Sequence, residues 1–440
     1  MLNNPVDKCR KVLVISNACF SNTDSNGRTL AQLFSGFSSN EIAQFFVYGI
    51  PDFSVCQDYY KVTDYDALTS FLRQKEVGDV IKSAFSDTNY SDVSSVKKRK
   101  KTPRTMLLRE IAWKYGRWNG KKLHQWLDKI QPKCIVLFVA DNIFLLELAY
   151  KVAEKYQVPI IMYSTEDYYF KEYNYITKKR SIAYKMFHEK LKKAYHKIEK
   201  YVAKGLFNTQ ELAMAYGKAF QFPCEALYAK SDIDFIENAT IPTDHKKVVV
   251  SYLGNMGLNR HKALIALADM LSEVDPDIKL NVYGKIPENA REDLLENSNI
   301  LYRGFVDYEE VVRVMHSSTL LVHVEDDNAF YNIDLKHAFS TKIADSVCSG
   351  TPFLIYAPEM LAETKFLKRQ KCAFVVSEPI DLKNRLQVAL FNLEERQNVL
   401  QNARIAKESI FTNKNELKKV VDEYTMKKAH KEEENESSSN

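Results

Sequence analysis

A lysine and an aspartate stand three residues apart in the stretch FSTKIADSVCSGTPF, which runs from Phe339 to Phe353. Lys342 and Asp345 fall where a helix is expected to begin, and the apolar run FLIY follows directly after Pro352. In parallel α/β proteins, the start of a helix presents backbone N–H groups that hold anionic ligands. The same pattern is also typical of an ordinary capped helix, so the stretch alone leaves both interpretations open.

A second group of cations follows an earlier apolar run, in LGNMGLNRHKAL at residues 253–264. Gly254 and Gly257 permit a tight turn, and Arg260 and Lys262 lie where a helix is expected to start. The oxygens of a diphosphate are bound well by a point charge together with a forked donor, which lysine and arginine supply. The alternative is a basic turn that faces solvent. Neither GxxxxGK[ST] nor GxGxxG is present.

The elements that must position these residues are short apolar runs separated by helix-length gaps. Continuous apolar character, without alternation, is typical of parallel strands that are covered on both faces. We therefore predict an α/β fold with two doubly wound, Rossmann-like domains. The nine runs begin at Val12, Phe45, Cys134, Pro159, Val248, Ile278, Leu320, Phe353 and Ala373.

Glycines stand at the expected edges of these strands. Gly284 ends the run that begins at Ile278, and Gly304 precedes the run at Leu320, which would place glycines at successive loops along one sheet edge. In the first domain, Gly27 follows Asn26 and leads into an apolar helical pattern. This Asn-Gly pair is either part of a ligand loop or a plain turn.

A polar stretch with a proline, ENATIPTDHKK at residues 237–247, interrupts the periodic pattern. The predicted domains are therefore 1–240, which contains a basic, aromatic insertion near 85–126, and 245–405. A C-terminal helix is expected over 406–425. The low-complexity end, 426–440, is expected to be disordered.

The order of these features resembles the GT-B glycosyltransferases of the group 1 type, which use nucleotide sugars. The similarity covers most of the chain. Its clearest parts are YLGNMGLNRHKAL, VYG, GFV and STKIADSVCSGTPFLIYAPE, and its weaker parts are SNGRTL and STEDYYF. The resemblance implies a GT-B fold and transfer of a sugar from a nucleotide diphosphate sugar to a hydroxyl of a lipid-linked or oligosaccharide acceptor, with retention, in cell-surface polysaccharide synthesis.

The resemblance also implies roles for particular residues. Asp345 takes the place of the acid that binds the ribose hydroxyls. His337 stands where many members carry a second acid near the donor sugar, and Lys342 matches a subgroup with a lysine three residues before the acid. Arg260 and Lys262 would stabilise the leaving phosphate without a metal or another cofactor. The donor-binding residues implied are Gly27, Gly254, Asn255, Gly284, Gly304, His337, Ser340, Thr341, Lys342 and Asp345.

The acceptor hydroxyl must lose its proton as it attacks, which requires a nearby base. Asp141, Glu166 and Asp167 follow first-domain strands and stay as three alternatives. We expect the acidic run Glu325-Asp326-Asp327 to be a solvated strand end and not a metal site. Two other functions are kept open, a nucleotide-sugar epimerase of the same fold and a non-catalytic scaffold that binds the nucleotide sugar.

A basic region runs from Lys97 to Lys122 and holds eleven cations against one acid, although the whole chain carries only +5. Tryptophans are interleaved with it. The two interpretations are a loop and amphipathic helix facing solvent, or a contact with an anionic membrane, since each basic residue near such a surface contributes about 1 kcal/mol. The cations expected to bind lipid are Lys97, Lys98, Arg99, Lys100 and Lys101.

Composition limits the remaining classes. The chain has 440 residues, 45% of them hydrophobic and 27% charged, which is typical of a folded protein with two or three domains. The seven scattered cysteines form no CxxC pair and are expected to be reduced core thiols. No recognised nucleic-acid module accompanies the basic region. We expect a cytoplasmic protein without a transmembrane segment, placed on the inner face of the membrane where the basic region binds lipid.

Overall fold

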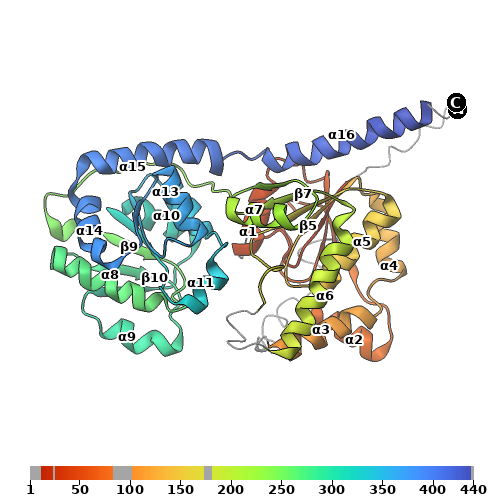
Figure 1. The fold of residues 1–440 in the computed structure, drawn as a ribbon, viewed down its shortest axis with the longest axis horizontal. Coiled ribbons are helices and arrows are strands. Elements are labelled where there is room, and N and C mark those ends of the chain that lie inside the picture. The colour runs from red at the N-terminus through yellow and green to blue at the C-terminus, as the bar shows by residue number, and fades with distance from the viewer. Residues whose placement is uncertain (1–10, 23–24, 83–101, 173–180, 438–440) are drawn as a thin grey trace. The chain divides into compact units, whose positions relative to one another are not determined.

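The computed structural model describes residues 11–22, 25–82, 102–172 and 181–437. It divides the chain into two compact units (Figure 1). Unit 1 consists of Met1–Leu227 and Lys414–Asn440, and unit 2 of Tyr228–Asn413. Each unit has its own sheet, so the prediction of two doubly wound α/β domains is confirmed.

The sheet of unit 1 has the strand order β4-β3-β2-β1-β5-β6-β7-β8. All pairs are parallel except β3 with the short edge strand β4. Its strands are β1 (Val12–Ile15), β2 (Ile42–Phe46), β3 (Asp58–Lys61), β4 (Asp79–Ile81), β5 (Cys134–Phe138), β6 (Ile160–Ser164), β7 (Val202–Phe207) and β8 (Cys224–Ala226). Its helices are α1 (Ser25–Leu33), α2 (Asp64–Arg73), α3 (Pro103–Tyr115), α4 (Lys121–Ile130), α5 (Ile143–Tyr156), α6 (Ile182–Glu199), α7 (Gln210–Ala219) and α16 (Glu416–Ser437).

The sheet of unit 2 has the order β11-β10-β9-β12-β13-β14, all parallel. Its strands are β9 (Val250–Leu253), β10 (Leu280–Tyr283), β11 (Ile300–Gly304), β12 (Leu320–Val324), β13 (Phe353–Tyr356) and β14 (Phe374–Val376). Its α-helices are α8 (Arg260–Val274), α9 (Arg291–Glu296), α10 (Tyr308–Ser317), α11 (Ala329–Leu335), α12 (Thr341–Cys348), α13 (Ala362–Gln370), α14 (Leu382–Phe391) and α15 (Leu393–Ala406). Short turns of other helix types are His245–Lys247, Glu288–Ala290, Pro379–Asp381 and Lys407–Phe411.

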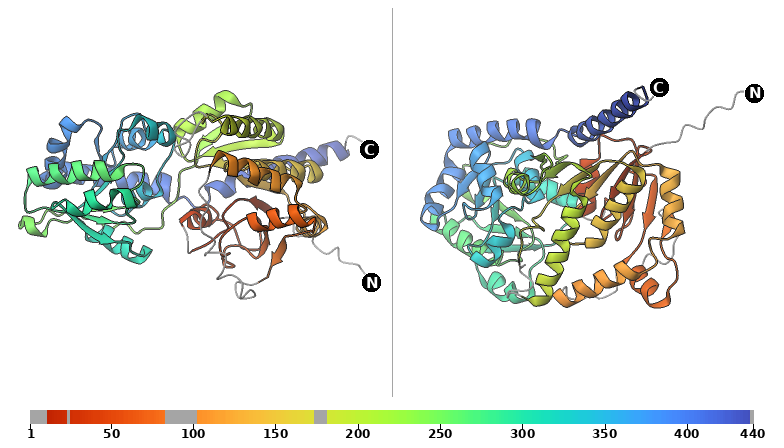
Figure 2. Two further views of the ribbon diagram at one scale, coloured as in Figure 1. Left: turned by 90° about the horizontal axis from the view of Figure 1, so that it is seen from below. Right: turned by 45° about the vertical axis from the view of Figure 1, so that its right-hand side comes forward.

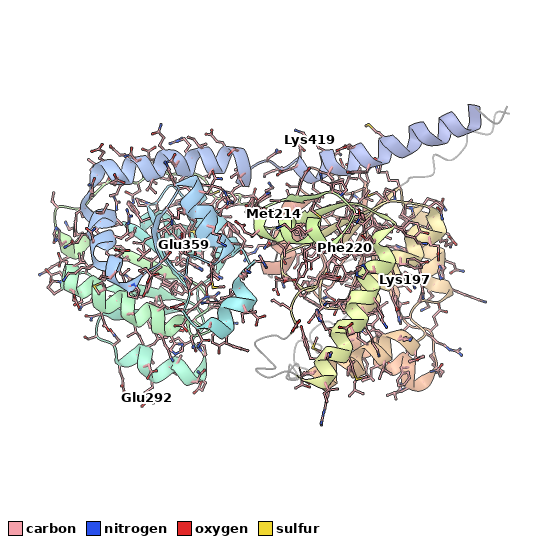
Figure 3. The ribbon with its side chains drawn as sticks, viewed as in Figure 1. Lys197, Met214, Phe220, Glu292, Glu359 and Lys419 are labelled. Carbon is pink, nitrogen blue, oxygen red and sulfur yellow. The ribbon has the colours of Figure 1, made fainter. Side chains whose placement is uncertain are left out.

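Both faces of each sheet are covered by helices (Figures 1 and 2). Successive residues of a strand enter different cores, since Leu13 belongs to one apolar cluster of unit 1 and Val14 to another. The same holds in unit 2 for Phe353 and Leu354. This two-sided burial explains why the central strands are continuously apolar in the sequence. Figure 3 shows the contrast at the surface, where Met214 on α7 is 55% exposed and Phe220 beyond its end is buried.

The domain boundaries differ from the predicted ones. Unit 2 begins at Tyr228 and not near 245, because the irregular segment at 236–238 bonds to this unit. The N–H of Ile236 donates to the carbonyl of Ser349 (3.0 Å), and that of Asn238 to Gly350 (2.8 Å). Gly350 is needed there, since a Cβ on it would lie 2.5 Å from the carbonyl oxygen of Ile236.

The C-terminal segments also differ from the prediction of a helix at 406–425 and a disordered tail at 426–440. The chain returns to unit 1 after Asn413, and α16 continues to Ser437. Leu417 and Val421 of α16 are buried in the core of unit 1. The sequence of the expected tail is rich in lysine and glutamate, which are good helix formers, so low complexity did not imply disorder here.

The basic region is not a surface insertion over its described part. Trp113, Trp118 and Trp126, on or between α3 and α4, are each at most 5% exposed and belong to the main core of unit 1. The interpretation that the tryptophans of this region face a membrane is therefore wrong. Lys97 to Lys101 lie outside the described residues. Among the described helices, none combines the length and apolar character that a membrane span requires.

Candidate functional site

The strand order of unit 2 reverses between β9 and β12. These two strands are parallel neighbours, with Leu320 of β12 opposite Val250 of β9. In doubly wound sheets, ligands bind beyond the carboxyl ends of the strands at such a reversal. The loop after β9 and the residue after β12 therefore mark the expected position of a ligand. Arg260 and Glu325 stand there, and their side chains join the two sides of the reversal.

Arg260 begins α8 and forms a two-pronged ion pair with Glu325. Its Nε lies 2.9 Å from both carboxylate oxygens, and a terminal nitrogen lies 2.5 Å from one of them. The Glu325 side chain is only 2% exposed. Burial acts to raise the pKa of Glu325, but the hydrogen bond from His323 and the charge of Arg260 hold it below its ordinary value. The expectation of a solvated acidic strand end is therefore wrong for Glu325.

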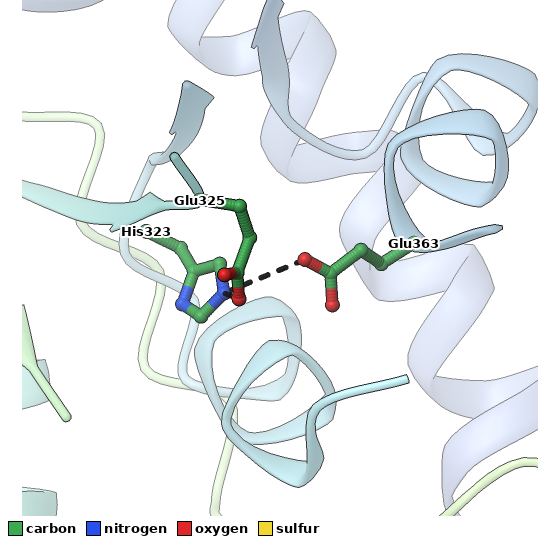
Figure 4. A group of neighbouring side chains, drawn as sticks. All are labelled: His323, Glu325 and Glu363. Atoms are coloured by element: carbon green, nitrogen blue, oxygen red, sulfur yellow. Dashed lines mark hydrogen bonds and ion pairs between the residues drawn. The ribbon is translucent and has the colours of Figure 1, made fainter. Parts of the chain in front are cut away.

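His323, Glu325 and Glu363 form a buried group beside this ion pair (Figure 4). The Nε2 atom of His323 lies 3.3 Å from Glu325 and 3.6 Å from Glu363. Burial acts to lower the pKa of His323, but its hydrogen bond to Glu325 and the nearby carboxylate of Glu363 raise it above the ordinary value. The ligand atoms of the three side chains are close enough to hold a metal ion. Arg260 already occupies both oxygens of Glu325, so the contacts are those of an ion-pair network.

Lys342 lies in the first turn of α12, close enough to these groups to respond to their charges. Burial, followed by the positive charge of Arg260, lowers the pKa of its ammonium group. The carboxylates of Asp345, Glu325 and Glu363 act against this lowering. No hydrogen-bond or ion-pair partner of this ammonium group occurs among the residues that the structure describes. The side chain of Ser340, at the N-cap of α12, makes no capping bond either. A buried cation beside an uncapped helix start favours an anion. We call Lys342 and the start of α12 the anion site.

The predicted glycines lie at one edge of the sheet of unit 2. The N–H of Gly254 donates to Tyr283 (2.9 Å), and the N–H of Gly284 donates to Gly304 (2.8 Å). Gly284 has φ +136°, and a Cβ on it would lie 1.8 Å from the carbonyl oxygen of Gly254. Only glycine permits this approach of two loops.

The remaining donor-binding candidates are more scattered. Asn255 follows Gly254 and is exposed, with its side-chain oxygen accepting from the N–H of Gly257 (2.8 Å). Asp345 lies one turn beyond Lys342 on α12, and its carboxylate accepts a hydrogen bond from Ser231 (2.7 Å). Thr341 starts α12, and His337 is half-buried between α11 and α12. Gly27 lies in unit 1, in the first turn of α1.

Lys262 is not brought together with Arg260. Residues two apart on a helix point in nearly opposite directions, and Lys262 is exposed while Arg260 is turned toward Glu325. The sequence paired Arg260 with Lys262, but the cation whose charge acts on Lys342 in the structure is Arg260, and these two residues come from different helices. Sequence reasoning did not find His323 and Glu363. A polar residue within an apolar strand, and an acid in the first turn of the helix after β13, were the available signals.

The predicted bases lie in unit 1, where the strand order reverses between β1 and β5. A cavity of about 870 Å³ opens at that reversal, and Asp141 and Glu166 line it. Asp167 does not line it, and its carboxylate accepts from the N–H of Phe170 (2.9 Å). Glu110 on α3, which the sequence did not single out, lines the cavity as well.

Neither a protein-family model nor a curated protein matches the sequence. Solved structures do match over nearly the whole chain. HepE of Anabaena in complex with UDP is 12% identical with a TM-score of 0.58, and the match covers 94% of this chain and 100% of HepE. HepE with UDP and glucose is 11% identical (TM-score 0.54, covering 96% and 99%).

WaaG, a glycosyltransferase involved in lipopolysaccharide biosynthesis, is 12% identical with a TM-score of 0.53, and the match covers 94% of this chain and 100% of WaaG. At such low identity the likeness concerns the fold alone. Together with the two doubly wound sheets, it confirms the predicted fold: the chain has the GT-B fold.

Proposed function

We propose that the protein is a glycosyltransferase that binds a nucleotide diphosphate sugar in unit 2 and transfers the sugar to a hydroxyl group. One observation carries the proposal, namely that the ammonium group of Lys342 has no hydrogen-bond or ion-pair partner within the described part of the chain and lies at an uncapped helix start, beside the reversal of strand order. The glycine edge at Gly254 and Gly284 lets backbone N–H groups approach a ligand closely. HepE, which has the same fold, binds UDP.

In this proposal the leaving diphosphate lies at the anion site. Lys342 contributes a point charge and the start of α12 contributes N–H groups, and both would stabilise the charge that develops on the phosphate as the glycosidic bond breaks. Arg260 stays paired with Glu325 and holds the two sides of the strand reversal together. The proposed reaction uses no metal ion, so turnover is expected to persist in EDTA. Asp345 is proposed to bind the ribose hydroxyls.

Thermal-shift measurements with UDP, GDP, dTDP and CMP test the donor. Lys342→Ala is expected to weaken binding of the stabilising nucleotide at least tenfold, about 1.4 kcal/mol, because it removes the free cation. Lys336→Ala removes the same charge from an exposed position just after α11 and should leave binding unchanged. Equal effects of the two variants would reject the anion site.

The ribose role of Asp345 needs a separate control, since this carboxylate also accepts a bond from Ser231. Asp345→Ala is expected to abolish nucleotide stabilisation. Ser231→Ala removes the same internal bond but leaves the carboxylate, and it should keep most of the stabilisation. An unchanged shift in Asp345→Ala, or an equal loss in Ser231→Ala, would contradict the ribose role.

Turnover with the sugars of the stabilising nucleotide then separates the possible activities. We propose retention of configuration, a lipid-linked or oligosaccharide acceptor and a role in cell-surface polysaccharide synthesis, all supported by the sequence resemblance. Retention is checked from the anomeric form of the product. A product formed from the donor alone would indicate an epimerase, and nucleotide binding without turnover over a broad sugar and acceptor panel would indicate a scaffold.

We also propose that Lys97 to Lys101, which lie outside the described residues, hold the protein at an anionic membrane surface. Replacing all five with serine should release the protein from anionic vesicles. Vesicle binding that is unchanged in this variant would contradict the proposal.

A further inference from the structure

The cavity of unit 1 has the position and size of a ligand site. It lies beyond the carboxyl ends of β1 and β5, where Asn17 and Asp141 line it and where the order of strands reverses. Its volume, about 870 Å³, is within the range that binds small organic ligands. The lining residues that the structure describes all belong to unit 1.

One side of the cavity is apolar and open to solvent. Leu68 on α2 and Leu108 and Ile111 on α3 line it, and these side chains are 41%, 64% and 41% exposed. They contribute little to the core, so their exposure costs hydration free energy that a ligand with an apolar body would recover. Trp113, which also lines the cavity, stacks on Phe144 with ring centroids 3.7 Å apart.

The other side of the cavity carries carboxyl groups. Asp64 and Arg109 neutralise each other through an ion pair of 2.7 Å, and the indole N–H of Trp113 also donates to Asp64 (2.7 Å). The other charged groups among the described lining residues are the carboxyls of Glu110, Asp141 and Glu166, and Glu166, which is half exposed, lies 3.8 Å from the ammonium group of Lys171.

Carboxylates accept hydrogen bonds from hydroxyl groups and repel phosphate. Burial raises the pKa of Glu110 to about 7, and one oxygen of this carboxyl accepts a hydrogen bond from the N–H of Ile143 (3.3 Å). The polar side of the cavity is therefore suited to a head group that is uncharged and rich in hydroxyls.

We propose that this cavity binds an uncharged amphiphile, with a hydroxyl-rich head against Asp141, Glu166 and Glu110 and an alkyl or aromatic body against α2 and α3. Calling this ligand the acceptor rests on the proposed function. The binding itself does not, because it involves no nucleotide and no residue of unit 2. The proposal narrows the acceptor to glycolipid-like or aryl-glycoside molecules without a phosphate at the bound head.

Titration of the full chain with octyl glucoside, below the concentration at which it forms micelles, tests the proposal. All three tryptophans lie in unit 1, and Trp113 lines the cavity, so tryptophan fluorescence reports binding. Saturable binding is expected. Methyl glucoside should bind at least tenfold more weakly, because about two buried methylene groups account for that factor. Octyl phosphate should also bind more weakly. A methyl glucoside that binds equally well, or a preference for octyl phosphate, would overturn the proposal.

Matched serine variants separate the cavity from general surface adsorption. Leu108→Ser and Ile111→Ser change exposed cavity residues and should weaken octyl glucoside binding several-fold. Tyr115→Ser on α3 and Leu72→Ser on α2 change side chains that are 58% and 69% exposed but do not line the cavity, and they should leave binding unchanged. Equal weakening by all four variants would show adsorption to the helix surface and would refute a cavity ligand. UDP binding in each variant is measured in parallel, so that a failure here is distinguished from a failure of the donor site.

Discussion

The carboxyl group of Glu110 is expected to make the stability of unit 1 depend on pH. Burial raises its pKa from an ordinary value of 4.5 to about 7, against the lowering effects of Arg109 and of the N–H of Ile143, which donates to it (3.3 Å). The carboxylates of Asp141 and Glu147 act in the same direction as burial. The unfolded chain therefore loses this proton near pH 4.5, whereas the folded unit keeps it until about pH 7.

The sign follows from proton counts. Between these two pH values the folded state binds more protons than the unfolded state, so the free energy of unfolding falls as pH rises and then levels off above about pH 7. At about 1.4 kcal/mol per pH unit, the interval from 4.5 to about 7 corresponds to a loss of about 3 kcal/mol. Glu110→Gln keeps an oxygen for the N–H of Ile143 and carries no charge. It should be close to the original protein in stability at pH 4.5 and more stable at pH 8 by about 2 to 3 kcal/mol.

Urea unfolding followed by tryptophan fluorescence measures this difference, since Trp113, Trp118 and Trp126 all lie in unit 1. Glu189→Gln provides a control, because it removes the same charge from an exposed position on α6 and should leave the pH dependence unchanged. A Glu110→Gln advantage that is the same at pH 4.5 and pH 8, or a variant less stable than the original protein at pH 8, would refute the reasoning.

Three further predictions concern unit 2, and calorimetry measures each of them, with tryptophan fluorescence identifying the transition of unit 1. Because the pKa of His323 is raised on folding, its contribution to stability is complete below about pH 6.5 and is lost as pH rises through the folded pKa. His323→Gln should therefore lower the melting temperature more at pH 6 than at pH 9. An equal decrease at both pH values would contradict this. Arg396→Met should destabilise the unit by about 2 to 4 kcal/mol, because buried Arg396 donates hydrogen bonds to several backbone carbonyls, which would lose their donor. The bond to the carbonyl of Ala389 is 2.7 Å long. An equally stable variant would show that burying the charge of Arg396 costs as much free energy as its hydrogen bonds contribute. Gly284→Ala should cost more than Gly304→Ala, since a Cβ at Gly304 meets nothing within 4 Å and carries only the strain of φ +84°, of about 1 kcal/mol; equal costs would show that the loop at Gly284 can move aside.

Most strands with continuously apolar sequences were predictable, whereas β3, β4, β7, β8 and β11 were not. β1 and β13 match the apolar runs that begin at Val12 and Phe353, because both faces of these strands are covered. β7 was missed because Lys204 and Gly205 interrupt its apolar run, yet Lys204 is largely buried and pairs with Glu225 on the neighbouring strand β8. A pairing between distant residues of this kind leaves no local pattern.

Only the part of the site that is local in the sequence could be predicted. The stretch around Lys342 carried its own signal, since a cation and an acid at a helix start stand close in the sequence. The ion pair between Arg260 and Glu325 joins residues 65 positions apart, and the contact of His323 with Glu363 depends on the position of α13. These contacts depend on the tertiary fold and cannot be inferred from the spacing of residues in the sequence.

The ion pair also changes the roles of the two cations. Arg260 appeared from the sequence to be the phosphate ligand, but its Nε and a terminal nitrogen are committed to Glu325, whose side chain is almost fully buried. Withdrawing it toward a phosphate would leave a buried carboxylate that only His323 and the field of Lys342 could compensate, at a cost of several kcal/mol. Lys342 has no such bond to break among the residues that the structure describes. We therefore expect Lys342 to make the direct contact with an anion, and Arg260 to join the two sides of the strand reversal through Glu325.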